Sequence, residues 1–350
     1  MNAELEIYLI AFSISLLSSG AIFGLLRQRN QTGWDSLAGP QQIHQGAVPR
    51  IGGIAIIAGV SACFMFFQLP LLPLLTVVAM PVFLAGVVED FTGSVSAKLR
   101  LVVSLISGCL FCWITGYQIT GVGVDALGFL LAIPGISFVM TSLAVGAMVN
   151  ALNIVDGLNG LAGATAILMI GSFGVLFGQS GDFELKIICF VLVFACLGFL
   201  LWNFPFGKIF LGDGGAYFLG ALVAGIAVLL PERNDEISPF ASLLIIIYPF
   251  YELVRSTTRR IVAIGIRALE PDDKHLHSLI YKCLSARGLM SKSTQNSLAS
   301  VLVLMLPLLC CFWAVMFATE RSMLISGILV FIFLYETAMA SVLLIKSKNA

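Results

Sequence analysis

The sequence predicts an all-α, polytopic integral membrane protein. Of its 350 residues, 59% are hydrophobic and only 11% carry a formal charge, whereas a soluble globular domain has about 25% charged residues. The mean hydropathy is +1.01, and long apolar runs alternate with short polar breaks. These observations exclude a disordered chain, a nucleic-acid-binding protein with a basic face and an ordinary cytosolic enzyme.

Eleven apolar segments are candidates for membrane spans, because a spanning helix needs about 20 mostly apolar residues. In chain order they cover residues 5–26, 51–67, 71–88, 101–116, 129–149, 161–178, 185–202, 214–230, 240–258, 297–317 and 323–345. Each ends where polar or charged residues begin, and several contain the glycines that membrane helices use for close packing. No repeat or long linker interrupts the series, so we predict one helical domain over residues 1–350.

The distribution of Lys and Arg predicts the orientation. The net charge is zero, with 19 basic and 19 acidic residues. If the N-terminus lies outside, sixteen basic residues fall in one set of loops, and only Lys186, Arg233 and Arg321 fall in the other. We therefore place the sixteen in the cytoplasm, together with the C-terminus. The acidic start of the chain has no basic region, so a cleaved signal peptide is not expected.

Five polar groups fall in loops on the predicted cytoplasmic side, namely loops 27–50, 89–100, 150–160, 203–213 and 259–296. They contain His44 and Arg50; Glu89, Asp90 and Lys98; Asn150, Asn153, Asp156 and Asn159; Asn203, Phe210 and Asp213; and Arg259, Arg260, His275 and His277. Because Lys and Arg alone set the topology, the gathering of the other polar residues on one side is a separate indication of a single site.

The carboxylates have structural interpretations as well as functional ones. Glu89 and Asp90 would simply end a helix, but carboxylates are disfavoured beside the negative C-terminus of a helix. Asp156 lies in a run that stays apolar on both sides, where a carboxylate is costly and indicates a functional site. Asp213 either caps the following helix or uses its neighbouring glycines, which let backbone amides approach a phosphate.

The remaining polar residues are less specific. Asn150, Asn153 and Asp156 are spaced three apart and would share one helical face. His275 and His277 alternate, which is a weak pattern for zinc and equally consistent with contact to a diphosphate. The pair Arg259-Arg260 has a simpler interpretation as a positive-inside anchor.

The chemistry of these groups suits phosphoryl transfer at a membrane surface. Mg²⁺ binds through one or two carboxylates together with substrate phosphates, and it neutralises a diphosphate during transfer. A site at the membrane surface serves one water-soluble and one lipid substrate. The residues alone therefore predict metal-assisted phosphoryl transfer onto or off a lipid, without naming the substrates.

At these positions the sequence resembles the bacterial polyprenyl-phosphate N-acetylhexosamine-1-phosphate transferases of glycosyltransferase family 4. The strongest signals are residues 150–161 and the Phe210-Leu-Gly-Asp213-Gly-Gly-Ala segment, and the likeness extends from His44 to His277. It implies that a UDP-N-acetyl-hexosamine donates its sugar 1-phosphate to undecaprenyl phosphate, giving undecaprenyl-diphosphate-sugar and UMP. Mg²⁺, or Mn²⁺ in its place, would be the cofactor. The family also implies a homodimer.

The resemblance further implies a cytoplasmic site in the bacterial inner membrane, with a periplasmic N-terminus, and a first step in the synthesis of O-antigen or a related envelope glycan. It assigns catalysis to Glu89, Asp90 and Asp156; metal binding to Asp213; nucleotide-sugar binding to Asn150, Asn153, Asn159, Asn203, Phe210, His275 and His277; and lipid-phosphate binding to His44, Arg50 and Lys98.

Two positions depart from the family pattern. Glu89 stands where many members have Asp, so we place catalysis chiefly on Asp90. Asn159 also stands where many members have Asp, and it keeps a carbonyl acceptor for the uracil N3–H while losing the charge. We therefore expect Asn159 to contact the nucleotide and not to act as a base or metal ligand.

The sequence also admits two other classes of function. A transporter or flippase of lipid-linked sugars needs ionisable groups deep in the membrane, for which Glu336 and Glu252 are the candidates. An inactive scaffold homologue is disfavoured by the retained Asp90, Asp156 and Asp213. The sequence leaves open whether the sugar is N-acetylglucosamine or a 6-deoxy sugar such as N-acetylfucosamine or N-acetylquinovosamine. It also leaves open whether transfer is direct or passes through a covalent intermediate.

Overall fold

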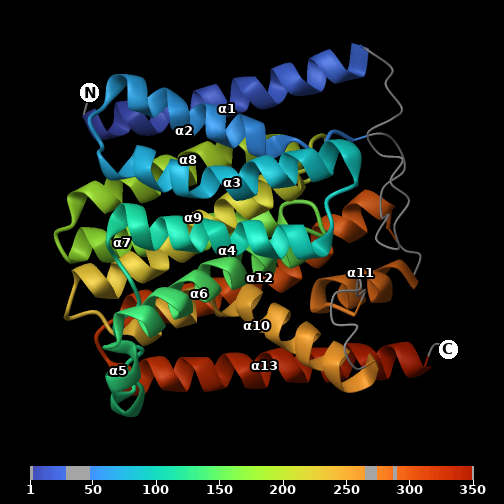
Figure 1. The fold of residues 1–350 in the computed structure, drawn as a ribbon. Coiled ribbons are helices and arrows are strands. Elements are labelled where there is room, and N and C mark those ends of the chain that lie inside the picture. Colours follow the sequence, from blue (N-terminus) through green and yellow to red (C-terminus); the bar gives the residue numbers. More distant parts are fainter. Residues whose placement is uncertain (1–2, 29–47, 265–273, 287–289, 349–350) are drawn as a thin grey trace.

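A computed structural model of the chain describes residues 3–28, 48–264, 274–286 and 290–348 (Figure 1). These residues form thirteen helices and no strand: α1 (Ala3–Gln28), α2 (Gly52–Phe66), α3 (Leu71–Thr92), α4 (Ala97–Thr115), α5 (Asp125–Leu131), α6 (Pro134–Val155), α7 (Leu161–Gln179), α8 (Phe183–Asn203), α9 (Gly212–Arg233), α10 (Pro239–Ile264), α11 (Leu276–Ala286), α12 (Lys292–Met316) and α13 (Arg321–Lys348).

The predicted all-α membrane architecture is confirmed. Within the described residues, ten helices are long and apolar enough to cross a membrane, namely α1, α3, α4, α6, α7, α8, α9, α10, α12 and α13. The eleventh predicted span, residues 51–67, is α2, which is apolar but has only 15 residues. Because α2 is short, the described residues contain ten candidate spans, one fewer than the eleven predicted from the sequence.

Two short helices were not predicted. The seven-residue α5 lies at the start of the predicted span 129–149, and α6 begins only at Pro134. Proline is favoured in the first turn of a helix and breaks a helix interior, so it separates the two. Helix α11 lies within the predicted loop 259–296.

The helices alternate in direction, so that the two termini lie at opposite ends of the bundle (Figure 1). The last turn of α3, the first turn of α9 and the short α11 lie at the end where α13 finishes. We call this the site end. Because polar residues far apart in the sequence meet here, the predicted gathering of the loops at one end agrees with the arrangement of the helices.

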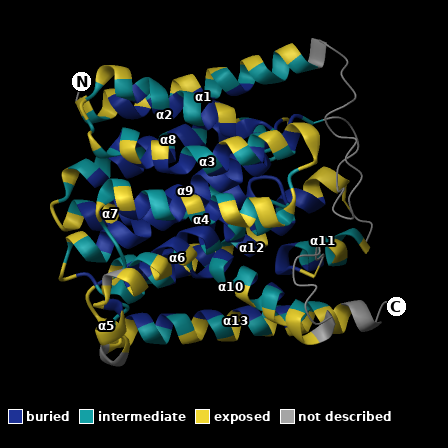
Figure 2. Ribbon diagram, viewed as in Figure 1, coloured by how far each residue is buried: buried dark blue, intermediate teal, exposed yellow. Residues whose placement is uncertain are grey.

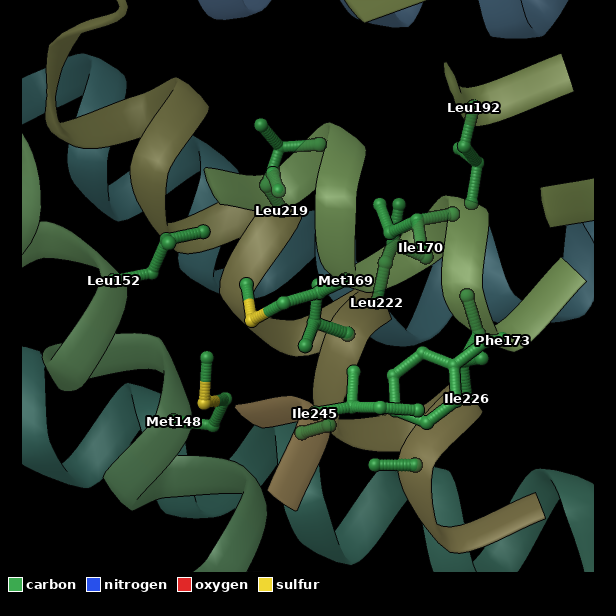
Figure 3. Close-up of a cluster of buried hydrophobic side chains, with 14 of the residues drawn as sticks. Met148, Leu152, Met169, Ile170, Phe173, Leu192, Leu219, Leu222, Ile226 and Ile245 are labelled. Atoms are coloured by element: carbon green, nitrogen blue, oxygen red, sulfur yellow. The ribbon is translucent and has the colours of Figure 1, made fainter. Parts of the chain in front are cut away.

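Helix α9 occupies the centre of the bundle. All residues from Gly212 to Leu230 are buried, and in Figure 2 the helix is almost wholly dark blue. Side chains of α6, α7, α8 and α10 surround it in the core cluster of Figure 3, where Leu222 and Ile226 lie near Met169, Phe173 and Ile245. Membrane helices associate through close packing of small residues, and the glycines of α9 permit that approach.

Candidate active site

The site is built on the start of α9, which is held by Asp90. The Asp213 backbone N–H donates to Asp90 Oδ1 and the Gly214 N–H donates to Oδ2, both at 2.9 Å. N–H groups at a helix start have no partner within the helix and carry partial positive charge. Asp90 lies in the last turn of α3 and is only 6% exposed. Its carboxylate therefore joins the end of α3 to the start of α9.

Two glycines permit this junction. Gly212 has φ +77° and lies against the Arg50 carbonyl, and a Cβ there would be 2.6 Å from Asp90 Oδ2. Gly86 lies one turn before Asp90 on α3, where a Cβ would be 2.5 Å from the Gly214 nitrogen. A side chain at either position would push the backbones apart, because such distances are well inside van der Waals contact.

Asp213 itself faces three donors. Its Oδ1 accepts from Asn153 Nδ2 at 3.0 Å and from Arg50 Nη2 at 3.3 Å. Its Oδ2 lies 3.6 Å from Arg100 Nη1. Arg50 also brings its Nε within 3.8 Å of Asp90 Oδ1. Asp90 and Asp213 are thus balanced by positive charge from Arg50, in the loop before α2, and from Arg100, in the first turn of α4.

Arg100 was not among the predicted site residues. Its Nη1 donates to the Tyr217 hydroxyl at 3.4 Å and lies 4.0 Å from Glu89 Oε1. Glu89 Oε2 accepts from the Val95 N–H at 2.7 Å, which ties the α3–α4 turn to α3. Ser96 caps α4 by accepting from the Leu99 N–H at 3.2 Å. The cap signal in the sequence fixes where this helix starts and was the one available pointer to Arg100.

Asp156 lies directly after the end of α6, beside this cluster. The pKa of its carboxyl group is raised to about 7, chiefly by burial and also by the charge of Asp213, while Arg50 and the Gly212 N–H oppose the shift. The predicted polar stripe on α6 is present in part, since Asn150 and Asn153 are helical and Asp156 caps the C-terminus. Its raised pKa sets Asp156 apart from an ordinary solvent-exposed aspartate.

The charges of the cluster suit a divalent cation. It contains four carboxylates and two guanidinium groups, from Glu89, Asp90, Asp156, Asp213, Arg50 and Arg100. With every group ionised, the balance is minus two. Among the described residues no three His, Cys, Asp or Glu form a ready metal cage, but Mg²⁺ needs only one or two carboxylates plus substrate phosphates. The residues present are compatible with such an ion, and Asp213 as its ligand stays a prediction.

The predicted nucleotide residues divide by their surroundings. Asn150 donates to the Gly146 carbonyl at 2.7 Å, one turn back on α6, whereas Asn153 reaches Asp213. Asn203 is fully used by the fold, since its Oδ1 accepts from the Gly160 N–H at 2.6 Å and its Nδ2 donates to the Ile209 carbonyl at 2.8 Å. Asn203 therefore shapes the loops beside the site.

Asn159 joins the same loops but keeps one acceptor unused. Its N–H donates to Asn296 Oδ1 at 2.8 Å and its Nδ2 donates to the Pro205 carbonyl at 3.1 Å. Its Oδ1 is buried and has no partner. A buried acceptor without a partner is costly, and this oxygen is the one that the sequence assigned to the uracil N3–H.

The two predicted histidines lie in a buried cluster on α11 and the residue before it. His275 Nδ1 is 3.0 Å from Glu252 Oε2, and Glu252 Oε1 accepts from the Leu276 N–H at 3.1 Å. The rings of His275 and His277 stack at 5.6 Å. A Cβ on Gly157 would lie 2.5 Å from His277 Nε2. His275 therefore links the start of α11 to Glu252 of α10, and His277 lies against the turn that carries Asp156.

Burial lowers the pKa of His277 to about 4, the negative charge of Glu252 opposes this shift, and His275 adds to it. His277 is therefore neutral at physiological pH. The two acids considered for transport are both paired. Glu252 bonds His275, and Glu336 accepts from Arg255 Nε at 2.8 Å and from Tyr251 at 3.0 Å.

Three predicted site residues remain, namely Phe210, Lys98 and His44. Phe210 is half-buried, and its backbone pairs with the first loop, donating to the Pro49 carbonyl at 2.8 Å and accepting from the Gly52 N–H at 2.9 Å. Lys98 is exposed on α4. His44 lies outside the described residues, as do parts of the predicted loops 27–50 and 259–296.

Acidic and basic side chains gather around the start of the central helix α9, and such a combination of charges suits phosphorylated ligands. Comparison with known protein families gives a match to Glycosyl transferase family 4 over residues 72–231. The matched region contains Asp90, Asp156 and Asp213. This match and the similar curated proteins agree with the family resemblance and with the phosphotransferase enzyme that the sequence predicts.

Similar curated proteins carry closely related names. The chain is 29% identical over 291 residues to an undecaprenyl-phosphate alpha-N-acetylglucosaminyl 1-phosphate transferase of Yersinia pestis, covering 81% of this chain and 77% of that protein. The protein of the same name in Escherichia coli K12 is 28% identical, with 68% and 66% covered. A probable undecaprenyl-phosphate N-acetylglucosaminyl 1-phosphate transferase of Bacillus subtilis is 27% identical, with 77% and 75% covered.

Proposed function

We propose that this protein transfers the sugar 1-phosphate of a UDP-N-acetyl-hexosamine to undecaprenyl phosphate, giving undecaprenyl-diphosphate-sugar and UMP. The observation that carries the proposal is the setting of Asp213, which faces Asn153, Arg50 and Arg100 at the start of α9. Relatives from three bacteria bear the name of this activity with N-acetylglucosamine as the sugar. We therefore propose N-acetylglucosamine as the first sugar to test.

The acceptor needs orientation more than deprotonation. A phosphate monoester has a second pKa near 6, so the lipid phosphate is already anionic at neutral pH. Its oxygen attacks the β-phosphorus in line, the bond from that phosphorus to the bridging oxygen breaks, and UMP leaves with the oxygen. The lipid phosphate and the diphosphate are both negatively charged, so they repel each other as they approach. Arg50 and Arg100 supply positive charge there, which reduces this repulsion.

The carboxylates then have distinct roles. Asp90 holds the first turn of α9 in place, so that Asp213 points into the site. Asp213 would hold Mg²⁺, which when bound supplies charge neutralisation for the diphosphate. Asp156, whose carboxyl pKa is raised to about 7, lies beside Asp213. In this proposal it accepts a hydrogen bond from the substrates. In this proposal the buried Oδ1 of Asn159 receives the uracil N3–H.

The cell biology of the proposal follows from the charge pattern. The site end carries most of the Lys and Arg residues of the chain, so by the positive-inside rule it faces the cytoplasm, where nucleotide sugars are made. We propose a location in the bacterial inner membrane and a role in starting an envelope glycan such as O-antigen.

The test is direct transfer in isolated membranes. Membranes that contain the protein are incubated with radiolabelled UDP-N-acetylglucosamine and undecaprenyl phosphate, with Mg²⁺ or with a chelator, and the lipid fraction is counted. We expect Mg²⁺-dependent label in lipid and release of UMP, both abolished in Asp213→Ala at equal expression. Parallel assays with UDP-activated 6-deoxy N-acetylhexosamines decide the sugar. No transfer from any UDP-sugar would refute the proposal.

A further inference from the structure

We propose that Arg100 binds the diphosphate of the nucleotide substrate and that Tyr217 positions it there. The inference rests on the proposed function for its ligand, a nucleoside diphosphate. It concerns a residue that the sequence pattern did not single out, because the neighbouring Lys98 was assigned to phosphate instead.

The contacts of Arg100 place its charge at the centre of the acidic cluster. Nη1 lies 3.6 Å from Asp213 Oδ2 and 4.0 Å from Glu89 Oε1. The side chain is 29% exposed, so it borders both the protein interior and the open side of the cluster. A group in this place is within reach of any phosphate that binds beside Asp213.

Arginine has the right chemistry for this ligand. The planar guanidinium carries five N–H donors in a fork that matches phosphate oxygens, and it stays charged at all working pH values. In the structure Asp213 and Glu89 are its counter-charges. A diphosphate beside Asp213 would offer this guanidinium further anionic oxygens.

Helix geometry decides between Arg100 and Lys98. Residues two apart on an α-helix are separated by roughly 200° around its axis, so only one of them faces the site. The Ser96 cap starts α4 in such a register that Arg100 meets Asp213, while Lys98 is exposed. A basic side chain at position 98 is therefore not equivalent to one at position 100.

Tyr217 of α9 holds the Arg100 guanidinium at one position alongside this helix. Its hydroxyl accepts from Arg100 Nη1 at 3.4 Å, and its side chain is buried, with 3% of the residue exposed. It lies four residues after Asp213, so the two share one face of α9. The hydroxyl thus holds the guanidinium within one helical turn of Asp213, which is a positioning role and not contact with substrate.

The experiment compares binding of UDP and of uridine to the purified protein in detergent with Mg²⁺, by calorimetry and by competition. We expect Arg100→Ala to weaken UDP binding about tenfold or more, as loss of a charged hydrogen bond implies, while uridine binding stays unchanged. Arg100→Lys should fall between, and Tyr217→Phe should weaken UDP binding by a smaller factor. The control Lys292→Ala, an exposed cation at the start of α12, should stay within about twofold of wild type.

Each outcome separates the inference from the proposed function. If the wild-type protein binds no UDP, the proposed function fails. If it binds UDP and both Arg100 variants bind it equally well, the assignment of Arg100 is wrong. Should Arg100→Ala fail to fold, Arg100→Lys and Tyr217→Phe decide by the same comparison of UDP with uridine.

Discussion

At the scale of single residues, the carboxylates of this site differ in what surrounds them. Asp90 has both oxygens on backbone N–H groups, whereas Asp213 receives side chains only from Asn153, Arg50 and Arg100. A carboxylate held by helix amides is a structural anchor, and one held by mobile side chains can exchange them for a ligand. Glu89 and Asp90 therefore have different partners in this structure, and the catalytic roles assigned to them from the sequence stay predictions.

We predict that Asp90→Asn lowers both stability and transfer. An amide replaces one acceptor by a donor that would face a backbone N–H, which costs about 1–3 kcal/mol. Displacement of Asp213 should then reduce transfer about 100-fold. Thermal unfolding in detergent and the lipid-transfer assay measure the two effects. The control is Asp235→Asn, an exposed acid beyond the far end of α9. Normal stability and normal transfer in Asp90→Asn would contradict the role of Asp90 in holding the start of α9.

A second residue-scale prediction concerns pH. The folded pKa of His277, about 4, lies below the unfolded value of about 6.5. Its contribution to stability is therefore complete above pH 6.5 and is lost as the pH falls toward 4, by about 3 kcal/mol at most. Thermal unfolding followed between pH 7.5 and pH 4.5 should show this loss, and His277→Gln should show a shallower decline. Parallel pH curves for the two proteins would count against a buried neutral His277.

At the scale of elements, the site depends on how closely α3 and α9 approach. Gly86 of α3 and Gly214 of α9 put the two backbones in contact, which is the small-residue packing that membrane helices use. The same contact brings Asp90 onto the first amides of α9. The geometry of the site therefore depends directly on the close packing of α3 against α9.

We predict that Gly86→Ala reduces activity through this contact. The added Cβ would lie 2.5 Å from the Gly214 nitrogen, so the helices must separate, at a cost of about 1–3 kcal/mol. Gly24→Ala on α1 is a matched control, because a Cβ there has nothing within 4 Å. Transfer activity and unfolding temperature should fall only in the first variant. Equal behaviour of both variants would show that α3 and α9 tolerate separation.

At the scale of the whole molecule, ten candidate spans and α2 carry the chain from one end of the bundle to the other and leave the termini at opposite ends. The polar groups of five loops meet at the site end. Which end faces the cytoplasm follows from the Lys and Arg pattern and remains a prediction.

That prediction is tested by labelling single cysteines in a cysteine-free background. Ser94, in the turn after α3, and Ser180, after α7, are both exposed and lie at opposite ends. In spheroplasts a membrane-impermeant maleimide should label Ser180→Cys and leave Ser94→Cys unlabelled until the membrane is opened. The reverse pattern would invert the topology and place the site outside the cytoplasm.

The sequence by itself determined the fold class, the candidate spans and the residue types of the site, because apolar length and the placement of charges are local properties of the chain. It located Asp90, Asp156 and Asp213 in separate loops. It did not separate α5 from α6, and it could not show that α2 is too short for an ordinary span.

Only the tertiary structure decided what these residues touch. That Asp90 caps α9, that Arg100 and not Lys98 faces Asp213, and that His275 is paired with Glu252 all depend on contacts between distant segments. Such contacts are set by helix register and by the close approach of backbones at glycines. These are properties of packed pairs of helices, and no single stretch of sequence contains them.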